Sequence, residues 1–290
     1  MITMHLQTNK FFLTCIFLCV TFSIKAQQKI DPQWGKADSL LQAHQYMASL
    51  VEYERIVFQS NDAGIKKQAI FKKAMVYKAM RSYEKTEEEL NRIGIRNPND
   101  TLFPLKAYEM AFAQYMTGNY QAALSTIETY GVMISGEHQV MPGLLTLKIL
   151  CYNQLFKFDR AESTIHQLAG LSNTHDSLNY TSLLTYYEKA PHYKNPETAK
   201  HLSILPGLGQ VYCGKVFEGG LSFLLNASAL SFGAWEVYSG YYFTGYVVGV
   251  TLLQKFHTGG QHRAELLARQ VNEKHILKFN QLIIDNLVSP

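Results

Sequence analysis

Cysteine, charge and the usual marks of a catalytic site are all sparse in this sequence. Only 17% of its 290 residues are charged and the net charge is +4. No stripe of Lys and Arg interleaved with aromatic residues is present, so nucleic acid is not expected as a partner. The spacing of the four cysteines does not require a disulfide. The 47% hydrophobic content excludes a disordered chain, and the length allows two compact units.

The residue patterns that carry chemistry are missing as well. No Ser/His/Asp, Cys/His or paired-carboxylate arrangement can be located in the sequence, so we expect a protein that is not an enzyme and has no catalytic residues. The histidines at positions 44, 138, 166 and 175 lack the spacing of metal ligands. The acidic run at 84–90 is typical of a solvated helix face. We therefore expect neither a metal nor a cofactor.

The N-terminal segment, residues 1–26, has the pattern of a secretory signal peptide. Lys10 precedes an apolar stretch at 11–24, and the small residue Ala26 comes before polar sequence. The stretch is shorter than the roughly 20 residues that span a bilayer. Export of the chain is the preferred interpretation, and an uncleaved anchor is the alternative.

Residues 33–172 contain an internal repeat with a period near 37. It aligns four aromatic residues, spaced 37, 37 and 38 apart: Tyr46, Tyr83, Tyr120 and Phe158. Three residues later each unit has a small side chain: Ser49, Thr86, Ala123 and Ala161. Four further on it has a large apolar one: Tyr53, Leu90, Ile127 and Ile165. Small residues let helices approach closely and large ones fill the space between them, so the pattern predicts about four antiparallel helix pairs.

This pattern resembles the tetratricopeptide repeat. The matching positions are the following: Ala74 with Tyr77, Gly118 with Tyr120 and Ala123, and Phe158 with Ala161. The resemblance implies an all-α solenoid whose concave groove binds a protein or peptide partner. The period exceeds the usual 34 of that family, so longer loops are expected between repeats.

After a helical linker at 173–200 the character of the sequence changes. Two apolar segments, 216–235 and 241–256, are joined by a short turn and flanked by aromatic residues, and several glycines suit close packing of the two. We expect a transmembrane helical hairpin that contacts membrane lipid through 216–256. A hydrophobic helical pair that caps the repeats is the main alternative, and a β-strand at 241–256 is a second.

A glycine-rich stretch precedes the hairpin, and part of it comes close to a phosphate-binding loop. Gly209 to Val216 reads G-Q-V-Y-C-G-K-V, where the loop pattern requires Ser or Thr at the last position to bind Mg²⁺. Pro206 also cuts off the short apolar run that would have to be the preceding strand. Nucleotide binding is therefore not expected.

The same stretch, read from Ser203, resembles a small family of two-helix membrane domains with a P-G-x-G-Q-x-Y-x-G-K motif. The matching residues are Pro206, Gly207, Gly209, Gln210, Tyr212, Gly214 and Lys215. The resemblance implies a two-helix membrane domain at 201–258, and a helical tail at 259–290 like that of bacterial envelope proteins. We interpret the motif as the turn at which the chain enters the membrane. Gln210 would satisfy carbonyls freed by the turn, and Tyr212 and Lys215 would lie at the head groups.

These features together predict a membrane-anchored, non-catalytic scaffold at the bacterial cell envelope. A cleaved signal peptide places the repeats on the periplasmic side of the inner membrane. Basic residues that flank the hairpin oppose this topology under the positive-inside rule: Lys200, Lys215, Lys255, Arg263 and Arg269. The alternative function is a subunit of a transport or envelope-assembly complex. Glu218 and Asn226 motivate it, because polar residues within a membrane segment usually face protein or water.

Overall fold

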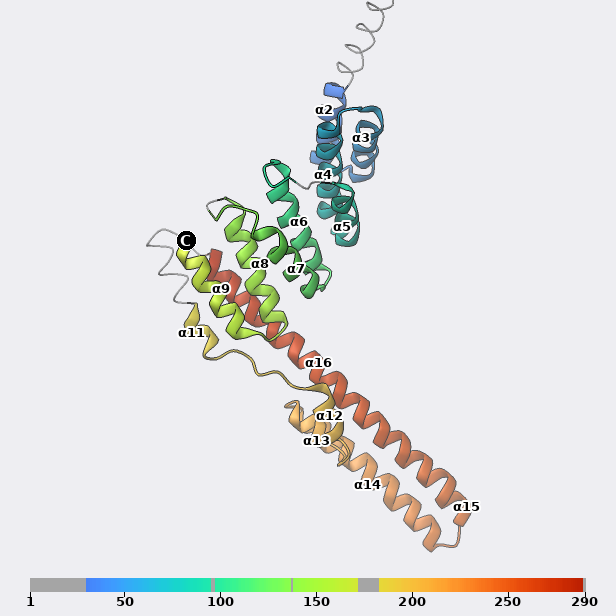
Figure 1. The fold of residues 1–290 in the computed structure, drawn as a ribbon. Helices are drawn as coiled ribbons and strands as arrows, with labels where there is room; N and C mark the ends of the chain where they lie inside the picture. The colour runs from blue at the N-terminus through green and yellow to red at the C-terminus, as the bar shows by residue number, and fades with distance from the viewer. Residues whose placement is uncertain (1–29, 95–96, 137, 172–182, 289–290) are drawn as a thin grey trace, which may run out of the picture. The chain divides into compact units, whose positions relative to one another are not determined.

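The computed structural model describes residues 30–94, 97–136, 138–171 and 183–288. Within these ranges the chain is helical and contains no strand, so the predicted all-α class is confirmed and the β-strand alternative is wrong (Figure 1). The predicted signal peptide at 1–26 lies outside the described residues. The chain divides into two compact units, one up to Cys151 and one from Tyr152.

The first unit is a series of antiparallel helices, most of which are connected by short turns. It comprises α2 (Ile30–Gln42), α3 (Tyr46–Gln59), α4 (Ala63–Ala79), α5 (Tyr83–Arg92), α6 (Leu102–Met116), α7 (Tyr120–Gly131) and most of α8 (Met141–Gln154). From α2 to α7, each helix packs against the next one in the sequence. Helix α4 also contacts α6.

The positions aligned by the repeat period are the buried ones. Every small and every large position of the alignment is at most 4% exposed in the structure. The aligned aromatic residue begins a helix in each case, at α3, α5, α7 and α9 (Phe158–Leu171). The period therefore predicts which side chains are buried and where the second helix of each pair starts.

One turn geometry precedes each of these four helix starts. Two residues before the aromatic, the backbone adopts positive φ: 57° at His44, 58° at Arg81, 79° at Gly118 and 56° at Phe156. The next residue donates its N–H to the carbonyl five residues earlier, at 2.8–2.9 Å. This is the Schellman motif, which satisfies carbonyls left unpaired at a helix end. Three of the four residues with positive φ are not glycine, the residue that adopts this conformation most easily.

A buried lysine connects three helices of the first unit. The Lys73 ammonium on α4 lies 2.7 Å from a Glu54 carboxylate oxygen on α3 and 2.6 Å from one of Glu89 on α5. Burial alone would lower the pKa of Lys73, but the hydrogen bonds to the two glutamates outweigh it and raise the pKa above its usual value. The two contacts are structural ion pairs that link α3, α4 and α5.

The second unit contains the predicted hairpin. It comprises α9, α11 (Leu184–Tyr187), α12 (Pro196–Leu202), α13 (Leu208–Tyr212), α14 (Val216–Tyr238), α15 (Tyr242–Thr244), the π-helix η1 (Gly245–Gly249) and α16 (Val250–Val288). Helix α14 packs against η1 and lies alongside α16, as Figure 1 shows for the two long helices. Helix α16 is one continuous helix of 39 residues, and it runs through position 258, where we expected the membrane domain to end and a tail to begin.

The distal part of α16 is held by a buried polar and aromatic cluster. The Asn153 side chain donates to Asn280 at 2.9 Å and accepts from the Tyr187 hydroxyl at 3.1 Å. The Phe279 ring contacts Phe158 and Tyr187 edge to face, with ring centroids 5.6 and 5.1 Å apart. Residues from 259 onward therefore belong to the same compact unit as α9 and α11.

The turn geometry makes a testable prediction about stability. Replacing exposed Arg81 by glycine relieves a positive φ, and we expect unfolding to cost about 0.5–1 kcal/mol more. Gly118→Ala is the reverse change at the equivalent position and should cost about 1 kcal/mol. Thermal unfolding of both full-length variants by circular dichroism checks the pair. A lower midpoint for Arg81→Gly would contradict this account of the turn.

Candidate functional site

The glycines of the P-G-x-G-Q motif allow backbone to lie directly against backbone. Gly207 has a φ of 94°, and a side chain there would overlap the Gly219 carbonyl on α14. A methyl group on Gly209 would overlap both the Ala199 carbonyl on α12 and the hydroxyl of Ser203. Pro206 is half-buried in the preceding turn. The motif therefore packs directly against both α12 and α14 at the base of the hairpin.

Gln210 is almost completely buried and bonds to another helix. Its side-chain amide donates to the Gly260 carbonyl on α16 at 2.9 Å, and its oxygen accepts from the Ser203 hydroxyl at 3.4 Å. We predicted that it would satisfy carbonyls freed by the motif's own turn. The bond instead links α13 to α16, where Gly260 leaves room for the approach.

Tyr212 and Lys215 differ in their surroundings. The Tyr212 hydroxyl accepts from the backbone N–H of Asn195 at 3.1 Å, and the Lys194 ammonium lies 4.7 Å from the centre of its ring. Tyr212 thus holds the start of α12, a structural role that the sequence interpretation missed. Lys215 is exposed at the N-cap of α14, after Gly214 with a φ of 78°. No strand precedes the motif in the described part of the chain, as a phosphate-binding loop would require.

Large apolar side chains cover the outside of the hairpin. We call them the apolar hairpin surface; they are at least 40% exposed and comprise Val216, Phe217, Leu221, Phe223, Leu224, Leu225, Leu230, Phe232, Trp235, Val237, Tyr238, Tyr241, Tyr242, Phe243, Tyr246, Val247, Val248 and Val250. Between positions 219 and 254 the only charged residue is Glu236. Exposed apolar patches of this extent mark sites of association with lipid or protein.

Among the helices of the described residues, none has both the length and the hydrophobicity that a membrane crossing needs. Helix α14 includes Glu218, Asn226 and Glu236, and α16 becomes strongly polar from Lys255 onward. The predicted membrane-spanning hairpin is therefore not confirmed.

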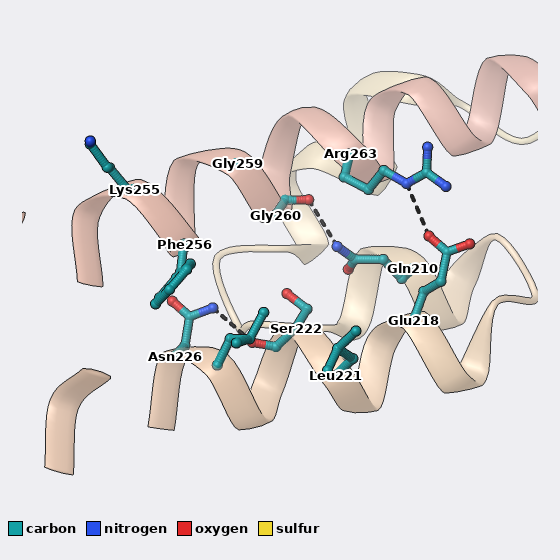
Figure 2. A pocket seen from close by; sticks show the side chains of 11 residues that line it. Gln210, Glu218, Leu221, Ser222, Asn226, Lys255, Phe256, Gly259, Gly260 and Arg263 are labelled. Atoms are coloured by element: carbon teal, nitrogen blue, oxygen red, sulfur yellow. Dashed lines mark hydrogen bonds and ion pairs between the residues drawn. The ribbon is translucent and has the colours of Figure 1, made fainter. Parts of the chain in front are cut away.

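A cavity of about 260 Å³ lies at the base of the hairpin between α13, α14 and α16 (Figure 2). The Glu218 carboxylate and the Arg263 guanidinium form an ion pair of 2.9 Å beside it. Asn226 donates to the Ser222 carbonyl at 2.8 Å. Glu218 is thus paired within this chain, and the amide nitrogen of Asn226 is bonded within α14. The Glu218 side chain therefore gives less support than we expected to packing against another membrane protein.

Toward the tip, three glycines bring the two arms of the hairpin into contact. A methyl group placed on Gly249 would lie only 2.7 Å from the Cα of Gly233. A methyl group placed on Gly245 would lie 2.9 Å from the carbonyl oxygen of Gly233. A second, apolar hollow of about 510 Å³ lies over this contact. The π-helical turn that contains Gly245 and Gly249 had no signal that we recognised in the sequence.

No protein-family model, curated protein or solved structure matches this chain. The similarities to tetratricopeptide repeats and to two-helix membrane domains therefore remain resemblances. Within the residues that the structure describes, no group of three or more His, Cys, Asp or Glu side chains is placed to hold a metal ion.

Adjacent glycines of α14 provide a matched test of the close backbone contact. A methyl group on Gly219 would lie 2.7 Å from the Gly207 carbonyl, whereas one on Gly220 would meet nothing within 4 Å. We expect Gly219→Ala to destabilise the second unit by roughly 1–3 kcal/mol. Gly220→Ala should be neutral or stabilise it by up to about 1 kcal/mol. Equal melting midpoints for the two variants would contradict this assignment.

Proposed function

We propose that the protein is a non-catalytic helical scaffold at the bacterial cell envelope. It attaches to membrane lipid through the hairpin at 216–256 and holds a protein or peptide partner on the repeats at 33–172. The observation that carries the proposal is the apolar hairpin surface, which is exposed to solvent along both arms and the tip of the hairpin.

Burial of this surface provides the driving force for attachment. Moving one fully exposed Leu, Val or Phe side chain out of water is worth roughly 1.5–3 kcal/mol. Phe217, Phe243 and Tyr238 are each at least 80% exposed, and many neighbours are about half exposed. Even partial burial of so many side chains exceeds the free energy required for stable attachment. Trp235 and the tyrosines near the tip are amphipathic residues that are enriched at membrane interfaces.

The uncharged length of the hairpin defines how it would enter lipid. Seventeen residues of α14, 219–235, extend about 25 Å at 1.5 Å per residue. This is shorter than the roughly 30 Å of bilayer hydrocarbon. The proposal is therefore insertion of the hairpin tip from one side, with Lys215 and Lys255 at the head groups, and it requires no helix that crosses the membrane.

The first unit offers apolar side chains for a partner. Phe58 and Val132 are each 89% exposed, and Met47 and Met133 are more than half exposed. Exposed aromatic and methionine side chains are typical of protein-binding surfaces. The resemblance to tetratricopeptide repeats supports a peptide or helix as the bound element. The predicted signal peptide supports a location on the periplasmic side of the inner membrane.

A second candidate function is that of a subunit in a membrane transport or envelope-assembly complex. The apolar hollow beside Gly233, Gly245 and Gly249 favours it, because apolar side chains of another membrane helix can pack into such a hollow. In that case the hairpin would bury its surface against membrane helices of other proteins. Crosslinking from Leu230 on the rim of the hollow distinguishes lipid from protein neighbours.

Insertion of the tip can be followed through Trp235. The chain has two tryptophans, and Trp34→Phe leaves Trp235 as the only one. We expect its emission to shift to the blue on addition of vesicles and to be quenched by brominated lipids. Leu224→Asp should weaken binding more than tenfold, because it places a charge in hydrocarbon. Leu266→Asp, an exposed leucine of α16 outside the hairpin, is the control and should bind normally.

The outcome that would contradict attachment is unchanged Trp235 emission and no co-flotation with vesicles. A blue shift that already occurs without lipid, together with a larger species in sedimentation velocity, would indicate that copies of the chain bury the hairpin against each other instead.

The proposed location has its own test. We expect protease added to cells with a permeabilised outer membrane to digest the first unit, while a cytoplasmic marker protein remains intact. A tag fused after Pro290 should be digested in parallel, since a hairpin inserted from one side leaves both flanks on that side. Protection of the first unit until the inner membrane is lysed would place it in the cytoplasm and overturn this location.

A further inference from the structure

We propose that the cavity at the base of the hairpin binds one membrane lipid whose head group carries a hydrogen-bond donor. The inference rests on the proposed attachment of the hairpin to lipid and specifies which lipids it prefers. It is carried by the cavity itself and by a buried acceptor that has no partner among the described residues.

The cavity has an apolar wall of a size suited to part of a lipid. Leu221 and Leu225 of α14 and Phe256 of α16 supply most of this wall around a volume of about 260 Å³. Gly259 leaves the space open, since a methyl group added there would meet no atom within 4 Å. An apolar pocket with few polar groups is the usual form of a small-ligand site.

Asn226 supplies the polar group. Its side chain is only 4% exposed, and its amide nitrogen donates to the Ser222 carbonyl at 2.8 Å. That bond fixes the amide orientation, so the other atom is the oxygen, which is buried and meets no donor in the described part of the chain. Figure 2 shows the amide between α14 and α16, beside Phe256. A buried acceptor without a donor costs roughly 1–3 kcal/mol, and a ligand that donates to it would recover this free energy.

The charged residues around the cavity indicate the depth at which it would lie. Lys255 lines one end and the Glu218–Arg263 pair lines the other, whereas the hairpin beyond them is uncharged apart from Glu236. If the uncharged part lies in hydrocarbon, this cavity lies at the boundary between the head groups and the hydrocarbon. A lipid there would place an acyl chain against the leucines and its head group near Asn226.

The required chemistry separates common lipids cleanly. The ammonium of phosphatidylethanolamine donates hydrogen bonds, whereas the quaternary ammonium of phosphatidylcholine has no N–H. Both head groups are zwitterionic, so a preference between them reports hydrogen bonding and not net charge.

Native mass spectrometry of the full chain, released from nanodiscs with equal amounts of the two lipids, tests the inference. We expect one retained lipid, with phosphatidylethanolamine enriched roughly three- to tenfold, as one net hydrogen bond allows. Asn226→Leu should abolish the preference. Ser228→Ala, a change at an exposed position half a turn away, should leave it intact.

A second variant keeps the test decisive if Asn226→Leu fails to fold. Gly259→Leu fills the open space without meeting a neighbour at its first carbon, and should remove the retained lipid. Equal retention of both lipids by the natural chain, as when Asn226 binds only a water molecule, overturns the inference. Trp235 still entering vesicles in that case would leave the proposed attachment standing, so the two failures are distinguishable.

Discussion

A helix that ends inside a compact protein must find donors for its last carbonyls, and this chain meets that constraint in the same way six times within the described residues. The four turns of the repeat share their geometry with the turns at Gly214 and Gly240, each of which is followed one residue later by a donor to the carbonyl five residues back. A helix starts directly after each turn, so consecutive helices become antiparallel neighbours. The helix pairs of the first unit and the hairpin of the second are thus products of one local device.

Features that depend on residues close together in the sequence are the easiest to predict from it. The period near 37 identified the buried positions and the helix starts, because each depends on neighbours within about one repeat. The Asn153–Asn280 hydrogen bond joins residues 127 positions apart, and the sequence around either asparagine does not predict it. The same holds for Gln210, whose type and burial follow from the motif but whose partner, Gly260, lies on a helix 50 residues away.

The close contact between the glycines of the hairpin explains why its large apolar side chains are exposed. Where Gly233 meets Gly249, the two arms touch through their backbones and leave no interior space for side chains. The leucines, phenylalanines and tyrosines of these arms must then point outward, and they are exposed. A hairpin in water would gain more by placing large side chains between its arms. This arrangement is the one expected when the surroundings, and not the interior, are apolar.

Because α16 is continuous, it would act as a rigid connection between the hairpin and the rest of the second unit in the proposed attachment. Between Gly260 at the base of the hairpin and Asn280 in the buried cluster, the helix has no break and extends about 30 Å. The base is fixed by the Gln210 bond, and the far end by Asn153 and Phe158. A hairpin held in lipid would therefore hold the α9–α11 cluster at a set distance from the membrane surface. Such a rigid spacer suits the proposed membrane scaffold better than a flexible tether would, because it fixes the distance of the second unit's core from the membrane.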